Sequence, residues 1–412
     1  MRNGPEIEGF EDRVVQFPAT RRKLLSMAAF LVIACGTSRD RIAQPRAGIM
    51  LKPNDKIALL TSGGDAPGMN SGLLAAAKVG FALGLEVVAV EEGYQGLIEG
   101  RIVPVDRAAL EAATRRGGTL IGSARSKRFM TPEGQEEAKA QIIRHRLKGL
   151  IVFGGNGSLT GAHALRNATA YDGGPFGIVG IPASIDNDLG CTSMAIGVDT
   201  AMNTIVEACD RIADTAYSHQ RTFIVEVMGR DCGYLAMTTG IAAGADAVLF
   251  REGKKTDQEL VDQVLRAIDA AYERPSGKKF VLVIQSEGVK LASHTLKEQI
   301  DSALKNRNQT IDTRVTVLGH VVRGGAPSAF DRLLASRFAN VAVRALVQGQ
   351  TQVMTGWMMP GQTKPACPFD PYIALWPLEE VLRETANMHV ADSPLVQWRI
   401  AALAEAEKVL CF

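Results

Sequence analysis

Two carboxylates stand two residues apart at the end of a short apolar segment. Residues 177–181 are rich in Val and Ile and have the character of a strand, and Asp186 and Asp188 follow in a polar turn. If residues 186–188 are extended, the two-residue period of a strand sends both side chains to the same side. One carboxylate could then take a proton from a hydroxyl while the other binds a divalent cation. The alternative is a turn in which the Asp and Asn side chains bond to their own backbone.

Two glycine-rich turns accompany this segment. Gly-Gly-Asp at 63–65 and Gly-Gly-Asn-Gly-Ser at 154–158 each lie between an expected strand and an expected helix. Glycine lets backbone N–H groups approach a phosphate, and the helix start adds a favourable dipole. Neither turn has the Walker sequence, and a tight turn is the alternative for each of them taken alone. Together with the paired carboxylates, they favour a phosphate-binding cradle.

Cations occur in three further segments. Arginine beside a glycine-rich loop suits bidentate recognition of phosphate. Any one of these arginines alone is more often a solvated surface charge, and the histidine alone is more often a structural hydrogen-bonding residue. Together, these cationic residues are more numerous than the binding of an uncharged sugar would require. The residues are Arg125, Arg221, Arg230, Arg314, His320 and Arg323.

Strands and helices alternate along the chain from residue 56. This pattern predicts mostly parallel sheets covered by helices on both faces, with right-handed crossovers, so we expect an α/β fold. In such sheets, ligands gather at the carboxyl ends of the strands. The expected strands are 57–60, 86–90, 149–153, 177–181, 223–227 and 280–284, and the expected helices are 70–83, 132–147, 197–215, 231–243 and 257–272.

Length and composition narrow the class of protein. The 412 residues exceed the usual size of a single core, so we expect two lobes. A hydrophobic content of 46% and a charged content of 22% are typical of a soluble globular protein. A formal net charge of +2 without a long run of Lys or Arg argues against nucleic acid as the main partner. Six scattered cysteines without a C-x-x-C pair favour reduced thiols in the cytosol over disulfides or a zinc site.

Taken together, these segments resemble the phosphofructokinase family. The resemblance covers roughly residues 55–350, with a looser match to the end, and its motifs follow the family's order and spacing. It implies two α/β lobes, each a mostly parallel sheet sandwiched by helices, with the site in the cleft between them. The matching segments are TSGGDAPGMN at 61–70, GGTLIGSAR at 117–125, PASIDND at 182–188, SHQR at 218–221, VEVMGRDCGYLA at 225–236 and VLGHVVRGG at 317–325.

The resemblance implies phosphorylation of fructose 6-phosphate by ATP, which yields fructose 1,6-bisphosphate in glycolysis. Asp186 matches the general base that deprotonates the sugar 1-hydroxyl, and Asp188 matches the Mg²⁺ carboxylate. Ser184 matches a hydroxyl beside the transferring group, Arg125 matches an arginine that bridges the phosphates, and Arg230 matches a second stabiliser of developing charge.

Binding residues are implied motif by motif in the same way. Arg221 and Arg314 match arginines that the family supplies from a neighbouring subunit, which implies a homotetramer. The nucleotide side is matched by Gly64, Tyr94, Arg125, Gly155, Asn156, Gly157, Ser158 and Gly161. The sugar-phosphate pocket is matched by Ser184, Asp186, Met228, Gly229, Arg230, Glu287, His320 and Arg323.

The resemblance also implies how the chain is divided. Residues 53–195, with part of the C-terminal region, are expected to form the nucleotide-binding lobe, and residues 196–350 the sugar-phosphate-binding lobe. Residues 351–412 are expected to form a helical tail that packs back on the lobes. Residues 1–52 are expected to be a poorly ordered extension.

Two positions distinguish the phosphoryl donors within the family. The pyrophosphate enzymes tend to carry Asp and Lys where this chain has Gly157 and Ala183. A bulky, anionic Asp would crowd the α-phosphate of a nucleotide, so the small residues favour ATP. Pyrophosphate, or another sugar phosphate such as sedoheptulose 7-phosphate, is the alternative substrate.

Asn156 departs from the family, which usually has Asp there as a second metal-associated carboxylate. Asn keeps a carbonyl oxygen but loses a charge, and Mg²⁺ favours hard anionic oxygens. Asn156 could hold a metal-bound water while Asp188 carries the charge. The alternative is slow turnover, or a regulatory subunit without chemistry. Because Asp186 and the arginines are present, we expect activity.

A basic cluster could bind an anionic effector between subunits. It comprises Lys78, Arg107, Lys278 and Lys279, and a solvated basic face is the alternative. Leu74 and Ala213 stand where bacterial members usually place arginines, which argues against their usual control by nucleotides or phosphoenolpyruvate.

The amino terminus has two interpretations. Basic residues 21–23 precede an apolar run at 24–34 and then Cys35, a pattern typical of a lipoprotein export signal. The run is too short to span a bilayer. We favour a non-native extension, because Met50 opens a new segment directly before the first strand and the implied site requires intracellular nucleotide. The expected location is therefore the cytoplasm, with neither membrane nor nucleic acid as a partner.

Overall fold

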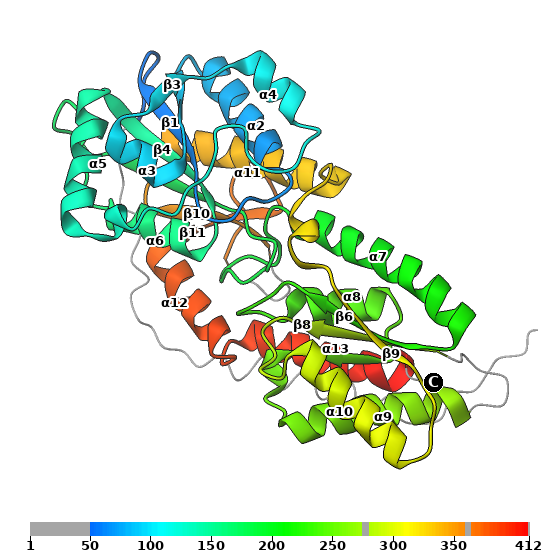
Figure 1. The fold of residues 1–412 in the computed structure, drawn as a ribbon. Coiled ribbons are helices and arrows are strands. Elements are labelled where there is room, and N and C mark those ends of the chain that lie inside the picture. Colours follow the sequence, from blue (N-terminus) through cyan, green and yellow to red (C-terminus); the bar gives the residue numbers. More distant parts are fainter. Residues whose placement is uncertain (1–49, 274–279, 359–363, 411–412) are drawn as a thin grey trace, which may run out of the picture. The chain divides into compact units, whose positions relative to one another are not determined.

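The computed structural model describes residues 50–273, 280–358 and 364–410. The first of its two sheets has seven strands in the order β11-β10-β5-β4-β1-β2-β3 (Figure 1). At its centre, β1 (Lys56–Thr61) pairs in parallel with β4 (Leu147–Gly154), which pairs in parallel with β5 (Gly177–Pro182). Most residues of these strands are buried, as expected for a parallel sheet covered on both faces. The other strands are β2 (Glu86–Val90), β3 (Ile102–Pro104), β10 (Val353–Trp357) and β11 (Ile373–Pro377).

Alternate side chains of β1 point to opposite faces of this sheet. Ile57 and Leu59 belong to a core with α2 (Met69–Ala82) and α11 (Ala329–Val347), whereas Ala58 belongs to a second core on the other face. Helices therefore cover both faces. The second core is completed by α3 (Gly93–Glu99), α5 (Pro132–Arg144), α6 (Asn156–Ala164) and α12 (Leu378–His389), and α4 (Arg107–Ala113) packs on α2.

The second sheet has four parallel strands in the order β7-β8-β6-β9. One face packs on α9 and α10, and the other packs on α7 and α8 (Figure 1). The strands are β6 (Thr222–Val227), β7 (Ala247–Leu249), β8 (Val281–Ser286) and β9 (Thr313–Val317), and the helices are α7 (Val198–His219), α8 (Tyr234–Ala242), α9 (Asp257–Glu273) and α10 (Ser293–Asn306).

One hydrophobic core continues from the first sheet to the second. It contains Leu59 and Val179 from the first sheet, and Val225 and Ile284 from the second. Both sheets lie within one compact unit. The predicted α/β fold with two mostly parallel sheets is therefore confirmed, and the two sheets share buried apolar contacts.

The helix expected over 132–147 is shorter than predicted. α5 ends at Arg144, and Arg146 takes a left-handed conformation with a φ of 58°. Leu147 then pairs with Lys56 as the first residue of β4. Pairing at the centre of the sheet therefore overrides the helical pattern of the sequence.

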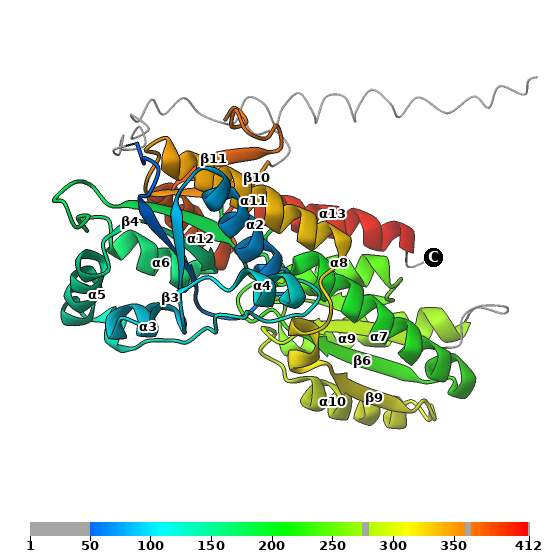
Figure 2. The same cartoon turned by 90° about the horizontal axis from the view of Figure 1, so that it is seen from above.

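The C-terminal region contains two strands that the sequence analysis did not predict. β10 pairs in parallel with β5, the strand that leads to the paired carboxylates, and β11 pairs antiparallel to β10. α12 then packs on α6, and α13 (Pro394–Leu410) packs on α8 (Figure 2). This region therefore completes the first sheet and contacts a helix of each sheet.

Some expectations fall outside the described ranges. They concern residues 1–49, with the export-like segment, and the cations Lys278 and Lys279. None of the helices that the structure describes is long and apolar enough to cross a membrane. The cysteines in the described ranges are buried and free: Cys191, Cys209, Cys232 and Cys367.

Asp331, a residue of α11, caps the N-terminus of α7. Its carboxylate accepts hydrogen bonds from Gly197 N at 2.8 Å, Thr200 N at 2.8 Å and Thr200 Oγ1 at 2.6 Å. Gly197 itself has no side chain with which to cap the helix. Because α11 covers the first sheet and α7 covers the second, this buried carboxylate links the two sheets.

Replacing Asp331 by Ala is expected to lower the free energy of unfolding by about 2–3 kcal/mol, because buried donors at the start of α7 lose their acceptor. Urea denaturation followed by circular dichroism measures the change. Asp210→Ala, at an exposed position of α7, is the matched control and is expected to change the stability by no more than about 0.5 kcal/mol. Equal stability of Asp331→Ala and the parent would contradict the capping role.

Candidate active site

Three loops come together at one edge of the first sheet. They follow β1, β4 and β5, whose carboxyl ends lie side by side because these neighbouring strands are parallel. A Cβ placed on Gly63 would lie 3.0 Å from Ser158 Oγ, and one placed on Gly155 would lie 3.6 Å from Ser184 Cβ. The loops after the three strands are therefore in contact, and the approach of Gly63 to Ser158 is close enough to favour glycine at position 63.

Residues 185–186 form a turn, so of the two alternatives for this segment the extended one does not hold. Asn187 has a φ of 49°, in the left-handed region that Asn tolerates better than most residues. Its side chain donates from Nδ2 to Ser193 O at 3.0 Å and accepts at Oδ1 from Ala195 N at 3.1 Å. These bonds reach residues beyond the turn, not its own backbone. They fix Asn187, and with it the directions in which the two flanking carboxylates leave the chain.

Asp188 is held at both carboxylate oxygens. Oδ1 accepts a hydrogen bond from Ser184 Oγ at 2.9 Å, and Oδ2 lies 3.5 Å from His389 Nε2, an ion pair when the imidazole is protonated. Burial opposes ionisation of Asp188, but the contacts with His389 and Ser184 outweigh it and lower the pKa of the carboxyl. Asp188 is therefore a fixed anion.

Asp186 differs from Asp188, since its Oδ1 is buried without a hydrogen-bond partner among the described residues. Burial raises the pKa of Asp186 to about 6, and the charge of Asp188 acts in the same direction. A carboxyl with this pKa is mostly ionised at neutral pH, yet it binds a proton more readily than an ordinary Asp. The site therefore contains a base whose buried oxygen no protein donor occupies.

Charged side chains from the second sheet surround Asp186. Arg323, Glu287 and Arg230 all act on its ionisation. Arg230 follows β6 and Glu287 follows β8, and because these strands pair in parallel, both residues lie at the same edge of the second sheet. Glu287 Oε1 accepts a hydrogen bond from Gly229 N at 3.3 Å, whereas Arg230 is largely exposed. The charges of two guanidinium groups and one further carboxylate therefore influence the ionisation of Asp186.

Arg323 connects the two sheets at the site. It ends the 3₁₀ helix η3 (Gly319–Arg323) and lies against Gly64, in the loop after β1. A Cβ on Gly64 would lie 2.8 Å from Arg323 Nη1, which donates to Asp65 O at 3.4 Å. The missing side chain at position 64 therefore lets a guanidinium group sit beside both the glycine-rich loop and Asp186.

Arg125 lies in a loop that is anchored on both sides. Ser123 Oγ donates to Gly63 O at 2.6 Å, and Ser126 Oγ donates to Gln95 Oε1 at 2.6 Å. The side chain of Arg125 is exposed, and no hydrogen bond or ion pair holds it within the described ranges. A fixed backbone thus presents a free guanidinium group near the glycine-rich loop after β1.

Three residues matched to the nucleotide side are buried. Tyr94 OH donates to Ser158 O at 2.7 Å, and its ring stacks on Phe129 with centroids 4.1 Å apart. A Cβ on Gly161 would lie 2.7 Å from the Tyr94 ring. In the structure, Tyr94, Ser158 and Gly161 therefore pack together and support the start of α6.

The start of α6 faces open space. Asn156 and Gly157 follow the N-cap Gly155, and a Cβ on Gly157 would have no atom within 4 Å. A helix N-terminus favours a bound anion. Gly155, the residue before Asn156, packs against Ser184, which bonds to Asp188.

Arg221 and Arg314 lie at the opposite edge of the second sheet. Arg221 precedes β6 and Arg314 is the second residue of β9, so both lie at the amino ends of their strands. Both form ion pairs of 2.8 Å with Asp312. The structure therefore does not bring these two arginines to Asp186 within one chain. The other residues matched to the sugar phosphate are Met228, which is buried, and His320, which is exposed on η3.

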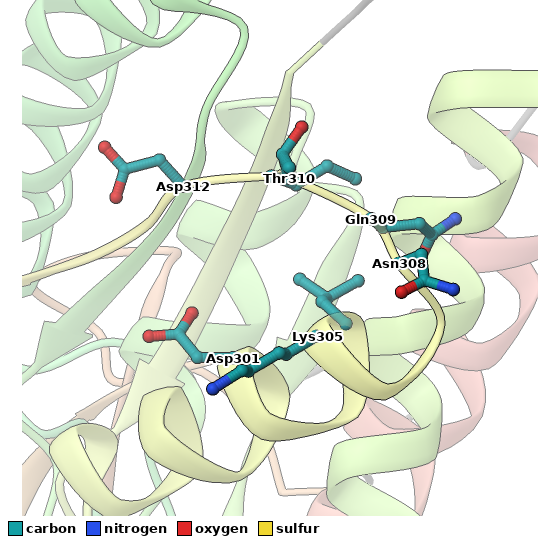
Figure 3. Close-up of a pocket in the computed structure, with 8 residues that line it drawn as sticks. Asp301, Lys305, Asn308, Gln309, Thr310 and Asp312 are labelled. Carbon is teal, nitrogen blue, oxygen red and sulfur yellow. The ribbon is translucent and has the colours of Figure 1, made fainter.

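A pocket of about 400 Å³ adjoins Asp312 (Figure 3). It is formed by the end of α10 and the segment that leads to β9, and it contains none of the residues predicted for the site. It lies at the amino end of β9, whereas the candidate active site lies at the carboxyl ends of the strands. Figure 3 labels Asp301, Lys305, Asn308, Gln309, Thr310 and Asp312 along it.

The expected basic cluster is partly neutralised. Lys78 Nζ lies 3.0 Å from Glu111 Oε1, and Arg107 Nε lies 3.2 Å from the same oxygen. One carboxylate therefore binds both cations that the structure describes, and this pair alone does not form a free anion pocket.

Two residues at the carboxylate turn were not predicted. His389 ends α12 and lies near Asp188, and Arg399 on α13 donates from Nη1 to Asn187 O at 3.1 Å. Both belong to C-terminal helices without a glycine-rich turn or paired charges to mark them. No local signal in the sequence points to these residues, and only the packing of the helices places them at the site.

Comparisons with known proteins agree on one family. A family model described as phosphofructokinase matches residues 56–346. An ATP-dependent 6-phosphofructokinase of Thermotoga neapolitana is 44% identical over 299 residues, 73% of this chain and 88% of that protein. One of Brevibacillus brevis is 43% identical over 301 residues, 73% of this chain and 89% of that protein. A solved phosphofructokinase of Saccharomyces cerevisiae matches with a TM-score of 0.72 and 33% identity. The match covers 87% of this chain and 50% of the yeast chain, so this chain spans half the length of the yeast chain.

Removing the charge of Asp186 is expected to stabilise the metal-free protein. The pKa of Asp186 is higher in the folded protein than in the unfolded chain. The ionised carboxylate therefore lowers the free energy of unfolding above pH 6, and this loss becomes smaller as the pH falls towards 4. Asp186→Asn should therefore raise the free energy of unfolding by about 2 kcal/mol at pH 7.5. Urea denaturation in EDTA at pH 7.5 and pH 5 measures it.

The gain should shrink at pH 5, and the exposed Asp210→Asn should show no such change between the two pH values. A loss of stability in Asp186→Asn at pH 7.5 would contradict the absence of a partner for this carboxylate.

Proposed function

Since this chain belongs to the phosphofructokinase family, we propose that it transfers the γ-phosphoryl group of ATP to the 1-hydroxyl of fructose 6-phosphate, forming fructose 1,6-bisphosphate and ADP. The observation that carries this proposal is the buried, unpartnered oxygen of Asp186 beside Arg323 and the glycine-rich loops. The sugar oxygen attacks the γ-phosphorus, the bond from phosphorus to the ADP oxygen breaks, and the hydroxyl proton passes to Asp186.

Asp186 acts as the general base in this reaction. A base in contact with the hydroxyl contributes roughly 10²–10⁴-fold to the rate. The pKa of about 6 supports this role, because the carboxylate is ionised at neutral pH and still accepts a proton. Ser184 and Asp188 hold the turn beside it through their mutual hydrogen bond.

Arginines stabilise the charge of the transferring group. Phosphoryl transfer requires little covalent chemistry from the protein, and its catalysis comes from positioning and from electrostatic stabilisation. We propose that Arg125 bridges the phosphates and that Arg230 stabilises the negative charge that develops during transfer. Both guanidinium groups are exposed at the site, and Arg323 adds a third on the sugar-phosphate side.

Mg²⁺ is the proposed cofactor, with Asp188 and Asn156 as its protein ligands. Mg²⁺ is commonly held by one or two carboxylates together with phosphate and water oxygens. Asp188 fits this use because its lowered pKa keeps it anionic, and Asn156 offers an amide oxygen. When bound, the ion supplies positive charge to the β- and γ-phosphate oxygens.

ATP is favoured over pyrophosphate by the open start of α6. Gly157 is exposed with no atom within 4 Å of a Cβ position, which leaves room for the α-phosphate of a nucleotide. Ala183 is buried and carries no charge for a pyrophosphate group. The rest of the proposed nucleotide site consists of Gly64, Tyr94, Gly155, Ser158 and Gly161.

The sugar phosphate is proposed to bind against the second sheet, in a homotetramer. Arg221 and Arg314 lie at the edge opposite to Arg230, so a role in sugar-phosphate binding requires the site of a neighbouring subunit. Within the chain, the pocket comprises Ser184, Asp186, Met228, Gly229, Arg230, Glu287, His320 and Arg323.

The lobes divide the substrates accordingly. The nucleotide is assigned to residues 53–195 with the C-terminal strands, and the sugar phosphate to residues 196–350. The proposed setting is the cytoplasm, because both substrates are intracellular metabolites.

A regulatory subunit with weak activity is the second candidate, and Asn156 is the observation that favours it. Loss of the second metal-associated carboxylate lowers the charge available to Mg²⁺. Such a subunit would bind ATP and fructose 6-phosphate with little or no turnover.

A coupled assay with ATP and pyrophosphate in parallel tests the proposal. We expect turnover of fructose 6-phosphate with ATP, little with pyrophosphate, and a loss of roughly 10²–10⁴-fold in kcat for Asp186→Asn. The exposed Asp210→Asn serves as the control with parental kcat. Binding of both substrates without turnover under either donor would favour the regulatory subunit, and turnover with pyrophosphate alone would reverse the donor assignment.

Asn156→Asp tests the metal assignment. The added carboxylate should lower the Mg²⁺ concentration for half-maximal rate by about 3–10-fold, because Mg²⁺ prefers anionic oxygens. Titration with Mn²⁺ monitored by electron paramagnetic resonance, in the presence of ATP, gives the affinity without relying on turnover. The exposed Asn167→Asp is the matched control. An unchanged dependence on both metals would place Asn156 away from the ion.

A further inference from the structure

The two C-terminal helices attach to the carboxylate turn at three points. Thr385 Oγ1 on α12 accepts a hydrogen bond from Gly190 N at 2.9 Å, shortly after the turn. His389, the last residue of α12, lies 3.5 Å from Asp188 Oδ2. Arg399 on α13 donates to the carbonyl oxygen of Asn187 at 3.1 Å. The turn between the two carboxylates is therefore held from outside the sheet that carries it.

Arg399 is a buried cation without a carboxylate partner among the described residues. Its side chain is 6% exposed. Besides the bond to Asn187 O, Nη1 contacts Cys232 Sγ at 3.8 Å, and the guanidinium carbon lies 4.3 Å from the centre of the Tyr234 ring. Burying a charge without an opposite charge is costly, and a carbonyl dipole and an aromatic face offset only part of that cost. A purely structural position would be filled as well by an apolar side chain.

The bond from Arg399 acts on a backbone group of the turn itself, the carbonyl oxygen of Asn187. Asn187 is in the left-handed conformation, and residues 193–195 bind both ends of its amide side chain. Arg399 binds its carbonyl oxygen, which fixes the peptide plane between Asn187 and Asp188. The N atom of Asp188 belongs to this plane, so the bond bears on the direction in which the Asp188 side chain leaves the turn, and Asp186 lies on the other side of the same Asn187.

The helix that carries Arg399 is itself held in place. α13 packs on α8, whose first residue is Tyr234, the ring beneath the guanidinium group. Arg251 donates to the carbonyl oxygen of His389, where the chain leaves α12. The position of Arg399 is therefore set by elements of the second sheet, whereas the turn that it binds follows β5 of the first.

We infer that Arg399 is a positioning residue for the base Asp186 and for Asp188, so that α13 is part of the active site. Arg399 touches neither carboxylate and acts through the Asn187 carbonyl. The inference rests on the proposed function for its kinetic consequence, but its structural consequence is independent of any substrate.

Arg399→Met tests the inference, because Met keeps an unbranched stem against Tyr234 while removing the donor and the buried charge. Hydrogen–deuterium exchange of the free protein, read on peptides covering residues 183–197, should become at least five-fold faster. In the coupled assay, kcat should fall at least ten-fold, with KM for ATP and fructose 6-phosphate within three-fold of the parent. Arg399→Lys keeps a cationic donor and should recover part of both losses.

Arg383→Met is the matched control, since Arg383 is an exposed arginine on α12, and it should leave both readouts at parental values. Parental exchange at 183–197, or parental kcat, in Arg399→Met overturns the inference, as does a loss confined to KM. If the parent itself shows no turnover with either donor, the proposed function fails, and the exchange measurement still decides the positioning role.

Discussion

A buried carboxylate oxygen without a donor costs folding free energy, and the site is built around the one on Asp186. Two residues away, Asp188 has both oxygens engaged, by Ser184 and His389. Burial therefore acts on both carboxyls, but contacts lower the pKa of only one of them. The difference gives one position the properties of a base and the other those of a fixed anion, although the two lie on the same turn.

The surrounding strands, loops and helices hold these two carboxylates in position. Parallel pairing of β1, β4 and β5 puts three loops at one edge, and glycines let them touch. The second sheet contributes Arg323 and Arg230, and a shared apolar core holds the sheets to each other. Arginines near Asp186 limit the rise of its pKa. Asp186 is therefore buried and still mostly ionised at neutral pH.

The sequence allowed the prediction of features that depend on neighbours along the chain. Strand-end glycines, the paired carboxylates and the alternation of strands and helices are local patterns, and parallel pairing brings them together. The sequence left open whether 186–188 is extended or a turn, because the left-handed Asn187 depends on bonds with residues 193–195. Arg399, which is 212 positions from Asn187, could not be predicted, since a buried arginine in a helix has no sequence pattern that names its acceptor.

The cap on α7 has a consequence for synthesis. Asp331 lies more than 130 positions after the helix start that it satisfies, and β10, which pairs with β5, comes later still. A chain growing from the ribosome therefore carries the start of α7 without its carboxylate cap until residue 331 has emerged, and a first sheet with an open edge at β5 until residues 353–357 have emerged. The first sheet is therefore completed only after all four strands of the second sheet have been made, and its open edge is exposed to pairing with other chains in the meantime.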